Sequence, residues 1–195
     1  MRPCQPRCEY DVSSHSDQLA GMKRKTEGCT KFLSDLHNFI VGDPQFRRDT
    51  KSKPEKAIQT EIRPLIIRFL EKYFSDAGYK DSTAKANKSF YWKGQEGEFG
   101  KDRATVFGSR NYPDFIITDP YLVAIEYAQS PNGSSIKRGI GQSMIHTLCG
   151  DFDFVYYLFH DQSPEKKIQK SIDREIEADI LRLAWNDFNV FVRFV

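Results

Sequence analysis

Two carboxylates, Asp114 and Glu126, are the residues of this sequence whose type and spacing best suit chemistry. Each lies at the outer end of a short apolar run, and the turn-forming residues 118–120 separate the two runs. The pattern predicts two antiparallel strands, which bring the acids, twelve positions apart, side by side at one end of a sheet. Neighbouring carboxylates repel each other, and a hard divalent cation such as Mg²⁺ relieves that repulsion. The alternative is a surface hairpin whose acids are solvated.

The same stretch resembles the PD-(D/E)XK signature of the restriction-endonuclease-like nucleases. Pro113-Asp114, an apolar strand, a turn, a second apolar strand and then Glu126-Tyr127 follow the order of that signature. The resemblance implies a metal-dependent endonuclease that hydrolyses phosphodiester bonds, most readily those of DNA. It also implies that Mg²⁺ or Mn²⁺ is bound by Asp114, Glu126 and the backbone carbonyl of Tyr127.

The resemblance extends to residues outside the hairpin. It implies a metal-facing glutamate on the first core helix, a position that Glu61 matches. It also implies that polar residues on the helix after the hairpin face the site, and Lys137 and Gln142 match these positions. Basic residues interleaved with aromatic ones indicate a nucleic-acid groove in the segment that contains Lys93, Lys101, Arg103 and Arg110. The alternative there is that the aromatic rings belong to the core and the charges are solvated.

Ala128 departs from the signature, which has a lysine two residues after the second acid. A lysine there supplies positive charge beside the attacking water and the phosphate, which alanine cannot do. Three explanations stay open: an engineered Lys→Ala change, a lysine that has moved to a position such as Lys137, or a module that binds nucleic acid or protein without cleaving. We interpret the chain as a catalytically disabled nuclease, because the residues around the gap otherwise follow the signature. A structural α/β domain with functionless acids is a further reading.

Helical and strand patterns alternate along the chain and predict an α/β fold. Helices are expected over residues 29–41, 54–77, 135–148 and 164–184, and further strands over 89–92, 153–160 and 190–195. Residues 45–54 are expected to be a linker or loop, and residues 94–108 a long loop or an irregular hairpin. Pro64 is expected to kink or split its helix. Together these elements suit a restriction-endonuclease-like α/β/α sandwich with a central mixed sheet. We expect this nuclease domain over residues 54–195, after an N-terminal arm over 1–53 with one short helix.

Apolar stripes predict which face of each later helix is buried. In the helix over 135–148 the stripe comprises Ile136, Ile140, Met144, Ile145 and Leu148. In the helix over 164–184 it comprises Ile168, Ile172, Ile176, Ile180 and Leu183. Gly139 and Gly141 are expected to let the first of these helices approach the sheet closely.

The composition is that of a globular chain, with 39% hydrophobic residues, 29% charged residues and a formal net charge of +2. This balance does not indicate a strongly basic nucleic-acid binder, although it leaves room for a local basic face. No apolar run approaches the roughly 20 residues that span a bilayer, and the N-terminus lacks the apolar core of a signal peptide. We therefore expect a cytoplasmic protein without membrane contact. The apolar final strand suggests a sheet edge for a homodimer.

Overall fold

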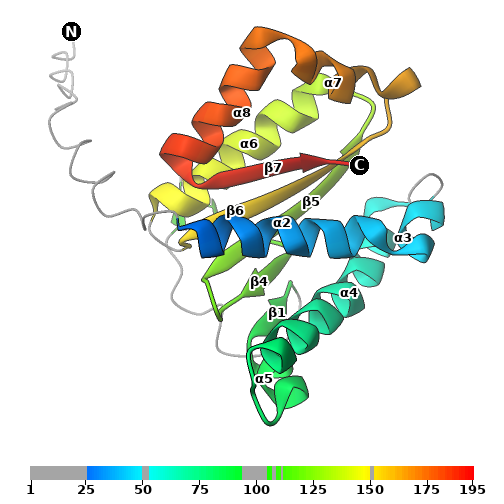
Figure 1. Cartoon of the computed structure of the whole chain (residues 1–195). Helices are drawn as coiled ribbons and strands as arrows, with labels where there is room; N and C mark the ends of the chain where they lie inside the picture. The colour runs from blue at the N-terminus through cyan, green and yellow to red at the C-terminus, as the bar shows by residue number, and fades with distance from the viewer. Residues whose placement is uncertain (1–25, 50–52, 94–104, 107–108, 111, 150–151) are drawn as a thin grey trace, which may run out of the picture.

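The computed structural model of this chain describes residues 26–49, 53–93, 105–106, 109–110, 112–149 and 152–195. At its centre lies a five-stranded mixed sheet in the order β1-β4-β5-β6-β7 (Figure 1). These strands are β1 (Phe90–Trp92), β4 (Phe115–Ile117), β5 (Val123–Ser130), β6 (Phe154–Asp161) and β7 (Val190–Phe194). The pairs β1·β4 and β4·β5 are antiparallel, whereas β5·β6 and β6·β7 are parallel. A separate antiparallel pair joins β2 (Thr105–Val106) to β3 (Ser109–Arg110).

Helices cover both faces of this sheet, so the α/β class expected from the sequence is confirmed (Figure 1). One face carries α2 (Glu27–Gly42), α3 (Pro44–Asp49), α4 (Glu55–Asp76) and α5 (Ser82–Lys88). The other face carries α6 (Gly133–Leu148), α7 (Lys167–Lys170) and α8 (Glu175–Phe188). Short 3₁₀ turns, η2 (Pro164–Lys166) and η3 (Ser171–Asp173), flank α7.

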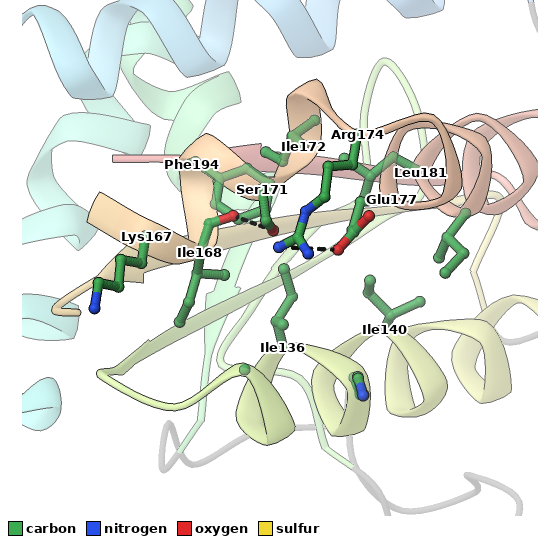
Figure 2. A pocket seen from close by; sticks show the side chains of 13 residues that line it. Ile136, Ile140, Lys167, Ile168, Ser171, Ile172, Arg174, Glu177, Leu181 and Phe194 are labelled. Atoms are coloured by element: carbon green, nitrogen blue, oxygen red, sulfur yellow. Dashed lines mark hydrogen bonds and ion pairs between the residues drawn. The ribbon is translucent and has the colours of Figure 1, made fainter. Parts of the chain in front are cut away.

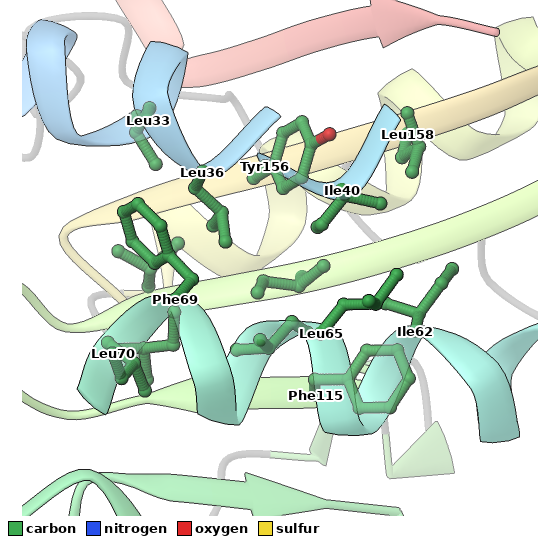
Figure 3. Packing of buried hydrophobic residues seen from close by; sticks show 14 of the residues in the cluster. Leu33, Leu36, Ile40, Ile62, Leu65, Phe69, Leu70, Phe115, Tyr156 and Leu158 are labelled. Atoms are coloured by element: carbon green, nitrogen blue, oxygen red, sulfur yellow. The ribbon is translucent and has the colours of Figure 1, made fainter. Parts of the chain in front are cut away.

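Two hydrophobic cores follow from the alternation of side chains along the strands. Phe115 and Ile117 pack into the core under α2 and α4, whereas Ile116 between them packs into the core under α6 and α8. All eight residues of β6 are buried, as expected for a central strand covered on both faces. Figure 3 shows the first core, where Leu36 of α2 and Phe69 of α4 meet the sheet. The helix expected in the N-terminal arm therefore belongs to the same core as residues beyond position 53.

The structure confirms the hairpin and most of the long elements. β4 and β5 form an antiparallel hairpin, and α2, α4, β6 and β7 lie where the apolar patterns predict them. Pro64 neither splits nor ends its helix, because α4 continues through it from Glu55 to Asp76. Pro64 is exposed, so the carbonyl that its missing N–H leaves without a helical partner can bind water.

The expected loop over 45–54 is wrong in its first half, where the chain forms α3. The carboxylate of Asp43 accepts the backbone N–H groups of Gln45 and Phe46, at 2.9 and 3.1 Å. Proline at the first helical position, Pro44, completes a standard helix start. Phe46 is buried against the core, which holds this short helix in place.

The single helix expected over 164–184 is also wrong. The chain is broken there into η2, α7 and η3, and Arg174 is extended immediately before α8. This break changes the helical phase, so α8 buries Ala184 and leaves Ile176, Ile180 and Leu183 exposed. Leu181 and Phe188 complete the face that packs on the sheet.

The buried face of α6 differs from the expected apolar stripe. Ile140 is buried as predicted, but Leu148 is exposed, and Ser143, His146 and Thr147 are buried instead. Small and polar residues take this face because α6 approaches the sheet closely at Gly139. A Cβ atom on Gly139 would lie 2.1 Å from the hydroxyl oxygen of Tyr157 on β6. The same expectation for Gly141 is wrong, because a Cβ there would meet nothing within 4 Å.

β7 is an edge strand of the sheet, as the sequence pattern suggested, and pairing with a second copy stays a prediction.

Among the helices of the described residues, none has the length and apolar character that crossing a bilayer requires.

The contrast between the two α6 glycines is testable. Gly139→Ala is expected to lower the free energy of unfolding by about 1–3 kcal/mol, because the added methyl overlaps the Tyr157 ring and forces α6 away from the sheet. Gly141→Ala is the matched control and is expected to raise it by up to about 1 kcal/mol through helix propensity. Urea unfolding of both variants measures the difference. Equal effects at both positions would contradict the close approach.

Candidate functional site

Asp114 and Glu126 lie side by side on the face of the sheet that α6 covers. Phe115 pairs with Ile125, so the next residue outward on each strand, Asp114 and Glu126, continues the same register. Both point to the α6 side, because Phe115, Ile125 and Tyr127 pack into the opposite core. The two acids line one pocket of about 200 Å³, which we call the acid pocket.

Asp114 is nearly buried, with 9% of its surface exposed. Burial, and after it the neighbouring Glu126 charge, raise the pKa of this carboxyl from its ordinary value of 3.8 to about 7. The backbone N–H of Tyr127, which donates to Asp114 Oδ2 at 3.0 Å, and the Lys93 ammonium act in the opposite direction on this pKa. The surrounding protein therefore stabilises the charged form of Asp114 less than water does.

Glu126 is held by a histidine that the sequence patterns did not single out. His146 Nε2 lies 2.9 Å from Glu126 Oε1, and the histidine side chain is 1% exposed. The imidazole packs edge-on against Phe152, with ring centroids 5.6 Å apart. His146 follows Gln142 by four residues, so both share one face of α6. That spacing from an expected site residue is the signal that could have identified it.

Ala128 and Gln142 also line the acid pocket, as expected for residues of one site. Ala128 follows Glu126 by two positions on β5, so it lies on the same face of the sheet. A longer side chain at position 128 would extend into the space beside the two acids. The position thus has the placement of a site residue without a functional group.

The glutamate that reaches the acid pocket from α4 is Glu55 and not the expected Glu61. Glu61 pairs with Lys53 and lines a different pocket of about 100 Å³ near Asp43. Glu55 lies in the first turn of α4, where its carboxylate accepts the N–H of Gln129 at 3.4 Å. The two glutamates are six positions apart, which places them on different sides of the helix and about 9 Å apart along its axis.

On α6 the basic residue of the acid pocket is Arg138 and not the expected Lys137. Lys137 lines a separate apolar groove of about 350 Å³ between α6, α7 and α8. Figure 2 shows Ile136 and Ile140 of α6 on one side of this groove, and Ile168 and the Arg174–Glu177 ion pair on the other side. Consecutive helical residues point about 100° apart, so only one of two neighbours can face the acids.

Lys93 lines the acid pocket as well, although the sequence placed it only in a wider basic segment. The aromatic residues beside it belong to the fold: Tyr91 and Trp92 pack against the two cores, and the guanidinium of Arg63 lies 3.9 Å above the Trp92 ring. This agrees with the alternative reading of those rings as core residues. Of the other expected nucleic-acid contacts, Lys101 and Arg103 lie outside the described residues. Arg110 lies in β3, but its side chain is not described.

Tyr157 of β6 also lines the acid pocket. Its hydroxyl is buried and has no hydrogen-bond partner among the described residues. Burial raises the pKa of Tyr157, and the charges of Glu126 and Glu55 raise it further. The phenol therefore stays protonated near neutral pH and remains a hydrogen-bond donor.

Comparisons with protein-family models, with curated proteins and with solved structures found no match to this chain. Within the described part of the chain, no three His, Cys, Asp or Glu side chains are grouped as a metal site. A cation in the acid pocket would therefore depend on the two hairpin carboxylates, backbone oxygen and water. Such a ligand set suits Mg²⁺, which usually keeps several waters.

The burial of Asp114 beside Glu126 predicts how the stability of the chain depends on pH and on divalent cations. Unfolded Asp114 loses its proton near pH 4, whereas folded Asp114 keeps it up to about pH 7, so its contribution to stability falls as the pH rises through that window. Asp114→Asn removes this penalty and keeps an oxygen acceptor for Tyr127. Without divalent cations at about pH 8, the variant is expected to be about 2–4 kcal/mol more stable than the unchanged chain.

Chemical unfolding at several pH values, with and without Mg²⁺, measures this difference. Mg²⁺ is expected to stabilise the unchanged chain at about pH 8 and to leave Asp114→Asn unaffected, because binding of the cation requires both carboxylates. Asp187→Asn, at an exposed acid on α8, is the matched control. Equal pH profiles for Asp114→Asn and Asp187→Asn would contradict the buried charge.

Proposed function

We propose that this chain is a metal-dependent endonuclease of the restriction-endonuclease-like kind, which hydrolyses phosphodiester bonds of DNA. The observation that carries the proposal is the acid pair, Asp114 and Glu126, held at one pocket with the pKa of Asp114 raised to about 7. A protein gains nothing in stability by burying two adjacent carboxylates without a cation. A bound Mg²⁺ or Mn²⁺ would favour the charged form of Asp114.

The residues of the acid pocket fit a hard divalent cation. Asp114 and Glu126 offer carboxylate oxygens, and Tyr127 offers a backbone carbonyl. The N–H of Tyr127 turns toward Asp114, and the N–H and C=O of one strand residue point to the same side. The carbonyl of Tyr127 is therefore directed toward the β4 edge of β5, where the two acids lie. This supports the ligand set that the resemblance implies.

The protein groups around the acids have defined tasks in this proposal. When bound, the cation activates a water molecule and neutralises charge on the scissile phosphate. Tyr127 N–H fixes one oxygen of Asp114, which leaves the other free to bind. His146 fixes one oxygen of Glu126 in the same way. Arg138 and Gln142 reach the pocket from α6, where they can donate hydrogen bonds to phosphate oxygens.

Ala128 leaves the site without the positively charged lysine that the family signature has at this position. The residue lines the acid pocket, and alanine can neither donate a hydrogen bond nor carry charge. In our proposal this chain is an impaired form of the nuclease, with its acid pair intact. The same alanine favours a second candidate, a module that binds nucleic acid or protein on this fold without cleaving it.

Restoring the lysine tests the proposal. Ala128→Lys is expected to raise the rate of Mg²⁺-dependent plasmid cleavage by about 100-fold or more, because the ammonium stabilises charge that develops on the phosphate. Ala128→Met is the matched control, since methionine has similar length and no charge. EDTA is expected to abolish the activity of the lysine variant. A plasmid nicking assay measures all three proteins.

The outcomes separate the candidate functions. Equal rates for the lysine and methionine variants would contradict the role of charge at position 128. DNA binding without cleavage by any variant would favour the binding module. Absence of both Mg²⁺ binding and cleavage would rule out the proposed nuclease.

A further inference from the structure

We propose that Lys93 supplies, from a neighbouring strand, the positive charge that position 128 lacks, and that it contacts the scissile phosphate. The inference rests on the proposed nuclease function and deepens it. Lys93 lines the acid pocket together with Asp114, Glu126 and Ala128. The chain would then retain a weak activity of its own, carried by this lysine.

The backbone of β1 and β4 fixes the position of Lys93. Trp92 pairs with Phe115, and the N–H of Lys93 donates to the carbonyl of Asp114 at 2.9 Å. Lys93 is therefore the cross-strand neighbour of Asp114, and Asp114 is in turn the neighbour of Glu126. One row across β1, β4 and β5 thus reads lysine, aspartate, glutamate.

The side chains of this row point to the same face of the sheet. Phe90 and Trp92 pack toward the α4 side, whereas Tyr91 between them packs toward the α6 side. The alternation of side chains continues this order and turns Lys93 to the α6 side, where both acids lie. Adjacent strands are about 4.8 Å apart, so Lys93 is one strand from Asp114 and two strands from Glu126.

The electrostatics agree with this placement. Lys93 interacts electrostatically with Asp114 and lines the same pocket, so its charge lies beside the acids. Of the two basic residues on α6, Lys137 lines the separate groove between α6 and α8, whereas Arg138 lines the acid pocket and acts electrostatically on Tyr157.

The chemistry requires only a fixed positive charge from Lys93. In hydrolysis a water oxygen forms a new bond to phosphorus, and the ester P–O bond to the leaving oxygen breaks. The proton of the attacking water passes to solvent, and the leaving oxygen takes a proton from solvent. The ammonium of Lys93 donates to a non-bridging phosphate oxygen, whose charge grows as the new bond forms. It remains protonated throughout.

The test compares Lys93 variants in two backgrounds, with single-turnover cleavage of a DNA duplex in Mg²⁺ as the measurement. In the unchanged background, Lys93→Ala is expected to lower the rate by about tenfold or more, while Lys93→Arg keeps most of it. Lys88→Ala, an exposed lysine at the end of α5, is the matched control and is expected to leave the rate unchanged. In the Ala128→Lys background, Lys93→Ala is expected to cost less than about threefold, because the restored lysine carries the charge.

A second measurement separates a catalytic role from a structural one. Lys93→Ala removes a charge that opposes the binding of a cation, so calorimetric titration with Mg²⁺ is expected to show affinity at least equal to that of the unchanged chain. Loss of cleavage with Mg²⁺ affinity retained supports the proposal. Loss of both would assign Lys93 to holding the site together and overturn it.

The remaining outcomes distinguish this inference from the function on which it rests. If Ala128→Lys cleaves and Lys93→Ala costs the same in both backgrounds, or if the unchanged chain shows no cleavage, Lys93 does not replace the missing lysine. The proposed nuclease then stands without this inference. If no protein of the series binds Mg²⁺ or cleaves DNA, both proposals fail together.

Discussion

The antiparallel register of β4 and β5 is the constraint on which the rest of this structure depends. Phe115 opposite Ile125 leaves Asp114 and Glu126 as the next pair outward, on the face that α6 covers. A slip of one residue would turn one of the acids into the apolar core under α4 and an apolar residue toward α6. Where the backbone ladder ends, the N–H of Tyr127 bonds to the side chain of Asp114. The main chain of β5 thereby positions the carboxylate of Asp114.

The helix above the acids is adapted to them. Glycine at position 139 lets α6 descend onto the hydroxyl of Tyr157, which brings His146 within 2.9 Å of Glu126. An α6 with a fully apolar inner face would seal the sheet and leave no polar contact for the glutamate. His146 on that face bonds to Glu126, and together with the small Ser143 it explains why the apolar stripe was a poor guide there.

Helical phase decides which side chains complete the pocket. From α4 it is Glu55, and from α6 it is Arg138, each close in sequence to the residue expected on other grounds. A helix turns about 100° per residue, so an error of one position moves a side chain to another surface. The same reasoning applies to α8, whose late start at Glu175 leaves Ile176 exposed.

Local sequence alone determined the parts of this protein that depend on short-range order. The hairpin, its two acids and the long apolar elements were predictable, because turn residues, strand alternation and helical spacing act over a few positions. Tertiary structure alone decided which groups gather around the acids. Lys93, Glu55 and His146 come from three elements far apart in the chain, and their meeting depends on strand order, on the contact of α4 with the end of β5, and on the depth of α6. Those relations come from packing between distant segments, which no local pattern contains.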